Sequence, residues 1–519
     1  MIRQLTTGPR RTMPLLCGVP LARATGADIG PDCRGVDMRF ARLALPTLAV
    51  VLVLVTAAPG LAAVPVTQVS ADPYSNAASQ HRTEVEPDTF VAGSTIVSAF
   101  QVGRVPGGGS ANIGWARSAN NGATWTNGFL PGTTTVATPP GTFSAISDPA
   151  VAFDARHNVW LISSLGIPAS GANTVLTSRS TNGGVTWSNP VRTSTTGNPD
   201  KNWIVCDNTT TSPFYGNCYT EWDNTADGNR IKMQTSSNGG LSWGTARNTG
   251  DNATGLGGQP LVRPNGTVLV PMNSANQSQV RSFRSVDGGA SWRATVLVSS
   301  VSRHTVAGGL RTSPLPSAEM DAAGTAYVVW QDCRFRSSCA SNDIVMSKST
   351  SETTWGAVTR VPIDATSSTV DHFIPGVGID RSTSGSAARV GLTYYYYPTA
   401  ACTSSTCRLN VGFISSTNGG ASWGTATNVA GPMTLSWLAN TSQGRMVGDY
   451  ISTSVPAGGN AWPTIAVAKA PTGSTFDEAM YVPSGGLAIS GGTRRATSSG
   501  VVVTGPTAAA KRAPAVIRQ

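Results

Sequence analysis

The sequence has few charged residues and very few histidines. Only 12% of its 519 residues are Asp, Glu, Lys or Arg, and only four are His. It contains no CxxC pair and no cluster of histidines, which excludes the usual zinc sites. Low charge, 57 Gly and 33 Pro, with Ser, Thr and Val between them, predict an all-β protein of many short strands.

The net charge of +10 is concentrated at the two ends of the chain. Residues 1–63 hold seven Arg and three Asp, and residues 485–519 hold five basic residues and no acid. Residues 64–484 are therefore almost neutral, so the high pI does not indicate a nucleic-acid-binding face, and we expect no nucleic-acid partner. The Gly-, Ser-, Thr- and Ala-rich segment 485–519 is typical of a disordered basic tail.

The leader, residues 1–63, contains the pattern of a secretory signal peptide at residues 38–63. A short basic stretch, Met38–Arg42, precedes the apolar run Leu43–Ala58, and small residues follow at once. The run is short for a membrane anchor, which is the alternative interpretation. We therefore expect a secreted, extracellular monomer with no membrane span after removal of the signal.

The remaining cysteines fall into three close pairs, which fits export. They are Cys206 and Cys218, Cys333 and Cys339, and Cys402 and Cys407. Such spacing predicts three local disulfides formed in an oxidising compartment.

One octet recurs along the chain. It reads SANNGATW, STNGGVTW, SSNGGLSW, SVDGGASW and STNGGASW, ending at Trp125, Trp187, Trp243, Trp292 and Trp423, with a worn copy, STSETTW, ending at Trp355. Asn or Asp before Gly predicts a tight hairpin turn, in which the Ser and Asn side chains bond the turn's own amides. The Trp offers a large apolar face for burial. Spacings of 49 to 68 residues between these Trp predict a propeller or a solenoid.

The octet resembles the Asp-box, or BNR repeat, of the sialidase superfamily, over roughly residues 70–484. The resemblance implies a β-propeller of four-stranded blades in residues 64–484, with the boxes as turns between outer strands, away from the catalytic face. The first strands of successive blades are expected to start near Glu86, Asp148, Asp200, Gln259, Glu319, Asp371 and Asp449. This count gives seven blades; six, the number in typical sialidases, is the alternative.

Residues at these strand starts are expected to line a central funnel. The predicted catalytic residues are Asp148, Glu319, Asp371 and His372, and the predicted substrate-binding residues are Arg303, Arg311, Arg334, Tyr450 and Asp200. Carboxylate pairs serve glycosidases, and Arg binds an anionic sugar through two parallel hydrogen bonds. The same acids can instead bind a structural calcium ion or simply hydrogen-bond the backbone. We expect no cofactor to be required.

Three functions remain open for such a funnel. The first is a sialidase-like, exo-acting glycoside hydrolase. However, Val85-Glu86-Pro87 stands where the family's Arg-Ile-Pro is expected, so the resemblance implies the fold more than the substrate. The second is a polysaccharide lyase on uronate-containing glycans, with a His or Tyr base. The third is a non-catalytic propeller that binds a glycan or a protein.

Overall fold

The computed structural model describes residues 64–491 and 494–495, and in this part the chain is all-β. The predicted signal peptide and most of the predicted basic tail lie outside the described residues. The helical elements in this part are 3-10 turns: η1 (Thr225–Asp227), η2 (Ala307–Gly309), η3 (Ser337–Cys339), η4 (Gly385–Ala387) and η5 (Leu435–Trp437). None of its helices is long and apolar enough to cross a membrane.

The strands form seven consecutive antiparallel groups. The first three groups are β2 (Glu84–Ala92), β3 (Thr95–Arg104), β4 (Ser110–Ser118) and β5 (Thr126–Phe129); β6 (Ala145–Asp154), β7 (Val159–Ile167), β8 (Thr174–Ser180) and β9 (Val191–Arg192); and β10 (Pro199–Cys206), β11 (Cys218–Asn224) and β12 (Arg230–Ser236). A pair between Ser110 and Ile146 links the first two groups into one sheet.

The next three groups continue the pattern. They are β13 (Gly255–Leu256), β14 (Leu261–Val262), β15 (Val268–Ser274), β16 (Gln279–Ser285) and β17 (Val296–Ser300); β18 (Ser317–Met320), β19 (Ala326–Asp332), β20 (Asp343–Ser349) and β21 (Thr359–Arg360); and β22 (Asp371–Ile379), β23 (Val390–Tyr397), β24 (Arg408–Ser416) and β26 (Thr427–Thr434). Two short pairs lie apart from them: β25 (Ser422–Trp423) with β32 (Arg494–Arg495), and β27 (Ala439–Thr441) with β28 (Gly444–Met446).

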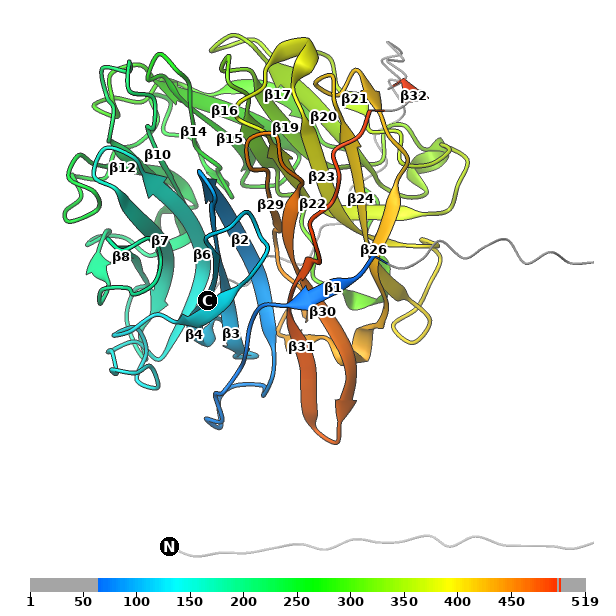
Figure 1. Cartoon of the computed structure of the whole chain (residues 1–519), viewed down its shortest axis with the longest axis horizontal. Coiled ribbons are helices and arrows are strands. Elements are labelled where there is room, and N and C mark those ends of the chain that lie inside the picture. The colour runs from blue at the N-terminus through cyan, green and yellow to red at the C-terminus, as the bar shows by residue number, and fades with distance from the viewer. Residues whose placement is uncertain (1–63, 492–493, 496–519) are drawn as a thin grey trace, which may run out of the picture. The chain divides into compact units, whose positions relative to one another are not determined.

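The seventh group joins the two ends of the described chain. It consists of β29 (Ser452–Ser454), β30 (Trp462–Thr472), β31 (Thr475–Pro483) and the first strand of the chain, β1 (Val66–Gln68), which pairs with β31. Figure 1 shows the blue β1 beside the orange β30 and β31. Pairing an early strand with the last hairpin ties the beginning of the fold to its end.

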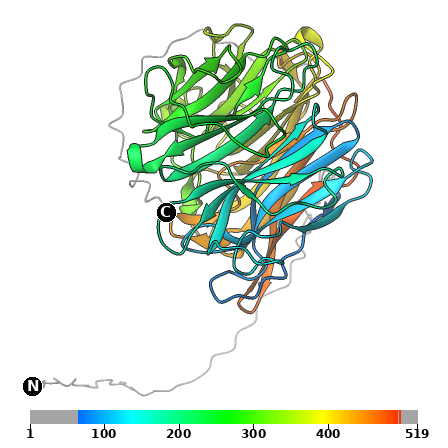
Figure 2. The ribbon, with the colours of Figure 1, turned by 90° about the vertical axis from the view of Figure 1, so that its left-hand side faces the viewer.

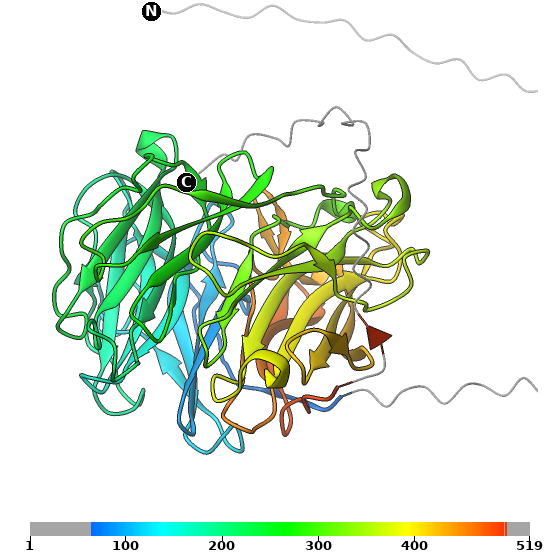
Figure 3. The ribbon, with the colours of Figure 1, turned by 90° about the horizontal axis from the view of Figure 1, so that it is seen from above.

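The first strands of the seven groups contact one another in a cycle. In order, β2 contacts β6, and the contacts continue through β10, β14, β18, β22 and β29, which returns to β2. Viewed from above, the cyan and green groups fill one half and the yellow and orange groups the other (Figure 3). From the side, the orange strands lie beside the blue ones (Figure 2).

The hydrophobic core lies between neighbouring groups. For example, Ile113 and Trp115 of the first group pack with Trp160 and Ile162 of the second. Each strand places alternate residues on opposite faces, so a sheet covered on both sides buries both sets of apolar residues. The core is thus a series of sheet-on-sheet layers.

The octets form the predicted turns. In the second one, Gly184 N donates to Ser180 Oγ over 2.9 Å, and Thr186 N donates to Asn182 Oδ1 over 3.0 Å. Gly183 and Gly184 both have positive φ, 74° and 84°, which favours glycine there. Trp187 is buried. The prediction that Ser and Asn bond the turn's own amides is confirmed.

The predicted disulfides are also confirmed. Cys206 bonds Cys218, Cys333 bonds Cys339, and Cys402 bonds Cys407. Each closes a short segment of chain, because the paired cysteines are 12, 6 and 5 residues apart. They fit an extracellular protein.

Candidate functional site

Three successive first strands contain the same irregularity at a charged residue. The pairing of β2 with β3, of β6 with β7 and of β10 with β11 shifts register at a bulge. At these bulges Glu86, Asp148 and Lys201 adopt left-handed backbone conformations, with φ of 60°, 48° and 52°. Such a conformation costs a non-glycine residue about 1–3 kcal/mol and persists only where surrounding structure imposes it. The bulge in β22 places Ile374 at φ 49°, without a charge.

The bulges bring together what we name the charge cluster: Glu86, Asp148, Lys201, Arg311 and Asp449. Lys201 Nζ lies 2.5 Å from Asp449 Oδ2 and 4.0 Å from Glu86 Oε1. Arg311 binds Asp449 through two bonds, Nε to Oδ1 at 2.7 Å and Nη2 to Oδ2 at 2.5 Å. Lys201 and Arg311 therefore share the carboxylate of Asp449.

Backbone amides hold the other two carboxylates of the charge cluster. Asp449 N donates to Glu86 Oε1 over 3.1 Å, and Gln101 Nε2 donates to the second oxygen of Glu86. Lys201 N donates to Asp148 Oδ2 over 2.9 Å, and Ser147 Oγ donates to Asp148 Oδ1 over 2.8 Å. The left-handed turn at Lys201 thus directs its amide to one acid and its side chain to another.

The carboxyl groups of the charge cluster differ in their affinity for protons. Burial raises the pKa of Glu86 to about 7, against the lowering effect of Lys201. Burial also acts to raise the pKa of Asp449, but Arg311 and Lys201 outweigh it and hold that pKa well below its usual range. Burial acts to lower the pKa of Lys201, but the charges of Asp148, Asp449 and Glu86 outweigh burial and raise this pKa. The charge cluster therefore holds a carboxyl that exchanges its proton near neutrality beside one that stays ionised.

Environments that push two carboxyl groups apart in pKa are typical of acid–base catalysis. A group with a pKa near the working pH can donate and accept a proton efficiently, and Glu86 meets this condition. Lys201 and Arg311 keep small exposed fractions, 12% and 14% of their side chains, so the cluster is open to solvent at these two residues.

A narrow cavity follows the charge cluster along the first strands. Residues from all seven groups line it, and it leaves about 30 Å³ to water-sized molecules. Asp88 lies on its wall, where burial raises its pKa to about 7. Glu319 lies there too, and its carboxylate is 2.8 Å from Arg381 Nη2. Glu319, a predicted catalytic residue, thus has its own basic partner.

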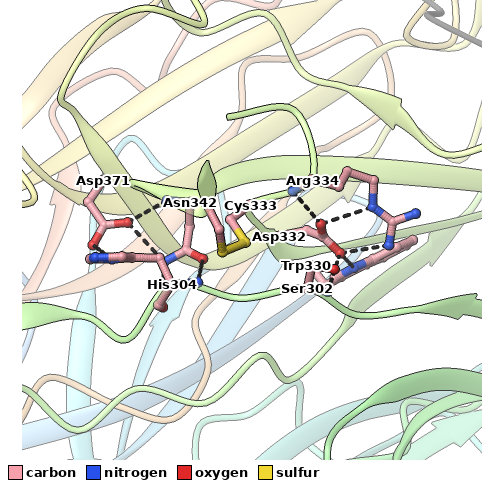
Figure 4. The surroundings of a disulfide bond; sticks show 9 residues. Ser302, His304, Trp330, Asp332, Cys333, Arg334, Asn342 and Asp371 are labelled. Carbon is pink, nitrogen blue, oxygen red and sulfur yellow. Dashed lines mark hydrogen bonds and ion pairs between the residues drawn. A yellow bond between two sulfur atoms is a disulfide. The ribbon is translucent and has the colours of Figure 1, made fainter. Parts of the chain in front are cut away.

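Asp371 belongs to a separate group beside the disulfide of Cys333 (Figure 4). Asn342 donates to Asp371 Oδ1 from N and from Nδ2, over 2.7 and 2.8 Å. Asn342 also accepts a bond from His304 N over 2.8 Å. His304 Nδ1 lies 3.4 Å from Asp371 Oδ2, and this carboxylate raises the pKa of the imidazole. Asp371 therefore orients a half-buried histidine.

His372 points instead into a buried network. It is 1% exposed and contacts the rings of Tyr394 and Tyr396. Its Nε2 lies 3.8 Å from Asp364 Oδ2, and burial lowers its pKa. His372 and Asp364 converge with a third metal-ligating side chain, Asp343. Arg336 and Arg360 bind both acids, so the group is already neutralised and does not favour a metal ion.

The remaining predicted substrate-binding residues are dispersed. Arg334 pairs with Asp332, and Arg303 donates to Gln277 Oε1 over 2.6 Å. Tyr450 is buried beside the charge cluster, donates to Pro149 O over 3.0 Å, and packs edge-on against Trp203 at 4.8 Å. Asp200 lies in β10 directly opposite Asp223. Of the predicted site residues, Asp148, Arg311 and Tyr450 lie together. The roles of all nine stay predictions.

The sequence prediction gave no catalytic role to Glu86, Lys201 or Asp449. Glu86 and Asp449 stand at predicted first-strand starts and Lys201 directly follows one, and this position is the signal that points to them. The left-handed bulge that directs Glu86 and Lys201 inward has no such signal, because it depends on pairing with the neighbouring strand.

No family model and no curated protein matches this chain. Solved structures resemble it weakly. A Hadza microbial sialidase superposes with a TM-score of 0.42 at 12% identity, over 78% of this chain and 65% of the sialidase, so this chain spans less than two thirds of that protein. An ulvan lyase from a new family of polysaccharide lyases gives 0.49 at 10% identity, over 81% and 97%. The NanB sialidase from Streptococcus pneumoniae gives 0.40 at 13%, over 80% and 70%. Likenesses at this level assign no activity to this chain.

Proposed function

We propose that residues 64–484 form a seven-bladed β-propeller of a secreted protein. Two observations support this architecture: the cyclic contacts of the seven first strands, and one cavity that residues of all seven groups line. Pairing of β1 with β31 would then close the ring, so that the first and last strands share one blade. Small-angle scattering of the secreted protein tests the proposal, because an open, solenoid-like stack is longer than a closed ring.

We further propose that the protein is a glycoside hydrolase with the charge cluster as its active site. One observation carries this proposal: the first strands of three successive groups hold charged residues in costly left-handed conformations, and all three side chains belong to one cluster. Strain of this kind concentrates at functional sites. The Asp-box resemblance supplies the substrate class, a glycan.

In this proposal Glu86 is the proton donor. With a pKa near 7 it is partly protonated at neutral pH and delivers its proton to the oxygen of the glycosidic bond. Asp148 supplies the second carboxylate that glycoside hydrolysis requires. Asp449 holds Lys201 and Arg311, whose spare N–H groups point a sugar hydroxyl or carboxylate toward the two acids.

Incubation with a panel of glycans tests the activity. The secreted protein is mixed with sialosides, arabinans and uronate-containing polysaccharides, and both reducing ends and ultraviolet absorbance of unsaturated sugars are recorded. New reducing ends without absorbance support hydrolysis. Retained glycan binding with neither signal leaves a binding propeller and rejects the enzyme.

One observation favours a lyase as the second candidate. His304 is half-buried, and its Nδ1 lies 3.4 Å from Asp371 Oδ2, so the carboxylate faces one nitrogen of the imidazole and Nε2 is the nitrogen that a substrate would meet. A base of this kind abstracts the proton next to a uronate carboxylate. Appearance of unsaturated product, lost in His304→Gln, identifies the lyase and rejects the hydrolase.

A further inference from the structure

A second pocket lies between the first and the seventh strand groups, beside the strands farthest from the first strands. One side consists of the octet turn that ends at Trp125, with Asn127 of β5, and the other of β1 and Trp462 of β30. The pocket leaves about 220 Å³ to water-sized molecules, against about 30 Å³ in the cavity along the first strands. The two linings share no residue, and no member of the charge cluster lines the second pocket. It is therefore a separate site.

The junction between these two groups differs from others in how it meets the octet. Elsewhere a basic side chain of one group bonds the octet of the next, as Lys348 Nζ bonds Gly419 O over 2.9 Å. Within residues 64–491 no basic side chain of the seventh group bonds the first octet. The ring of Trp462 lies there instead, so close that a Cβ at Gly122 would be 2.3 Å from its Cζ2. An aromatic ring thus takes the place of the cation, and the pocket lies beside it.

Two tryptophan rings form the aromatic part of the lining. The ring centroids of Trp125 and Trp462 lie 6.1 Å apart, with 54° between the ring planes. Trp125 is only half-buried, whereas the octet tryptophans Trp187 and Trp423 are buried. Trp125 Nε1 donates to Gly122 O over 3.0 Å, which fixes the orientation of its indole. A partly exposed ring that is already held in place can bind the apolar face of a ligand without a further ordering cost.

The polar groups around these rings are neutral. None of the described residues that line the pocket is charged. The side-chain amide of Asn127 is exposed and bonds no other residue of the described chain. Thr124 Oγ1 accepts a bond from Asn120 Nδ2 over 2.9 Å, which leaves the threonine hydroxyl able to donate. Gln68 is oriented by the hydroxyl of Tyr481, which donates to its Oε1 over 3.1 Å. Such a lining suits an uncharged ligand that is rich in hydroxyl groups.

We propose that this pocket binds one neutral pyranose unit of a glycan. A pyranose has an apolar C–H face, which packs on an indole, and hydroxyl groups at its edge, which bond amides and hydroxyls. The pocket is smaller than the about 300–1,000 Å³ of sites that enclose drug-sized ligands, so it takes a single sugar. A uronate or sialic acid is disfavoured, because its carboxylate would lose water without meeting a cation. Binding here does not depend on glycan hydrolysis at the charge cluster.

Isothermal titration calorimetry measures this binding. The full secreted protein is titrated with glucose, galactose and mannose, and with glucuronate and galacturonate as charged counterparts. We expect saturable binding of at least one neutral sugar, and binding at least about ten-fold weaker for the matching uronate. Glu86→Gln should bind the neutral sugar as the unaltered protein does, so the result stands even if the charge cluster hydrolyses no glycan. If Glu86→Gln loses the binding, the sugar binds at the charge cluster and the proposal is overturned.

Two variants locate the sugar. Trp125→Ala removes one ring and should weaken binding at least about ten-fold. Trp243→Ala, at the half-buried tryptophan of another octet, is the matched control and should bind as the unaltered protein does. Asn127→Ala changes an exposed side chain and should fold even if Trp125→Ala does not; we expect it to weaken binding about three-fold or more. The proposal is overturned if no neutral sugar binds the unaltered protein, or if folded Asn127→Ala binds as tightly as that protein.

Discussion

Arg179 Nε donates to the carbonyl oxygen of Gly239 over 2.6 Å, which ties the second strand group to the turn of the third. Arg179 directly precedes the Ser of its own octet, and Gly239 lies inside the next octet. Arg117 bonds Gly183 O in the same way, and Lys348 Nζ bonds Gly419 O over 2.9 Å. The octets are therefore connections between neighbouring groups as well as turns.

The worn octet preserves this connection by another bond. It has no Gly-Gly pair, and Arg284 Nε of the fourth group instead meets Glu352 Oε2 at 3.0 Å. An ion pair thus takes the place of the bond to a glycine carbonyl.

Removing one connection should destabilise the fold moderately. Arg179→Met keeps the aliphatic stem but loses the bond to Gly239 O, and we expect a loss of about 1–2 kcal/mol. Chemical denaturation measures it. The exposed Arg293→Met serves as the matched control and should change stability by less than about 0.5 kcal/mol. Equal losses in both variants would refute the connection's role.

Stability should fall as the pH rises from about 5 to 9. Burial raises the pKa of Glu84 to about 8, so the folded protein binds a proton that the unfolded chain releases near pH 4.5. A carboxyl group whose pKa is raised by folding stabilises the folded protein fully at a pH below its pKa in the unfolded chain. This contribution is lost as the pH rises through its pKa in the folded protein. Glu84→Gln still accepts the bonds from Ser70 Oγ and Met480 N.

The melting temperature of Glu84→Gln should therefore decline less over this range than that of the unaltered protein. The pH-dependent loss in the free energy of unfolding between pH 5 and pH 9 should differ between the two proteins by the order of a few kcal/mol. Asp227→Asn, at an exposed position, is the control. Parallel pH profiles for all three proteins would show that Glu84 does not retain its proton on folding.

The disulfide between Cys333 and Cys339 should stabilise the segment that leads to Arg311. Cys333 N donates to Ser302 O over 2.7 Å, so the disulfide-closed loop anchors the chain before His304. Replacing both cysteines with Ser should cost about 2 kcal/mol and increase hydrogen exchange in residues 302–304. Replacing Cys402 and Cys407 should cost a similar amount without that local increase. An unchanged exchange rate at 302–304 in the first variant would contradict the anchoring role.

The sequence predicts where many strands begin because turn chemistry is local. Ser180 to Trp187 encode one hairpin through their own side chains, and the prediction of an all-β chain with strands starting near Asp148 and Asp371 is confirmed. The repeat of such turns is enough to indicate the groups, without any knowledge of their packing.

The charge cluster is less predictable because its parts come from distant segments. Arg311 lies outside the named strands and reaches Asp449, 138 residues further along the chain. Nothing local to Arg311 distinguishes it from Arg303 or Arg334, which have other partners. The bulge at Glu86 likewise follows from how β2 pairs with β3.

The most direct test of the account compares turnover by Glu86→Gln and Asp148→Asn on the glycan that the unaltered protein hydrolyses. Both substitutions preserve size, and Asn tolerates the left-handed conformation of Asp148, so both variants should fold, with a melting temperature lowered by the loss of one accepted hydrogen bond in each. We predict at least about a hundred-fold loss of kcat for each, and unchanged turnover for Glu352→Gln. Folded Glu86→Gln and Asp148→Asn proteins with full activity would contradict the assignment of the charge cluster as the active site.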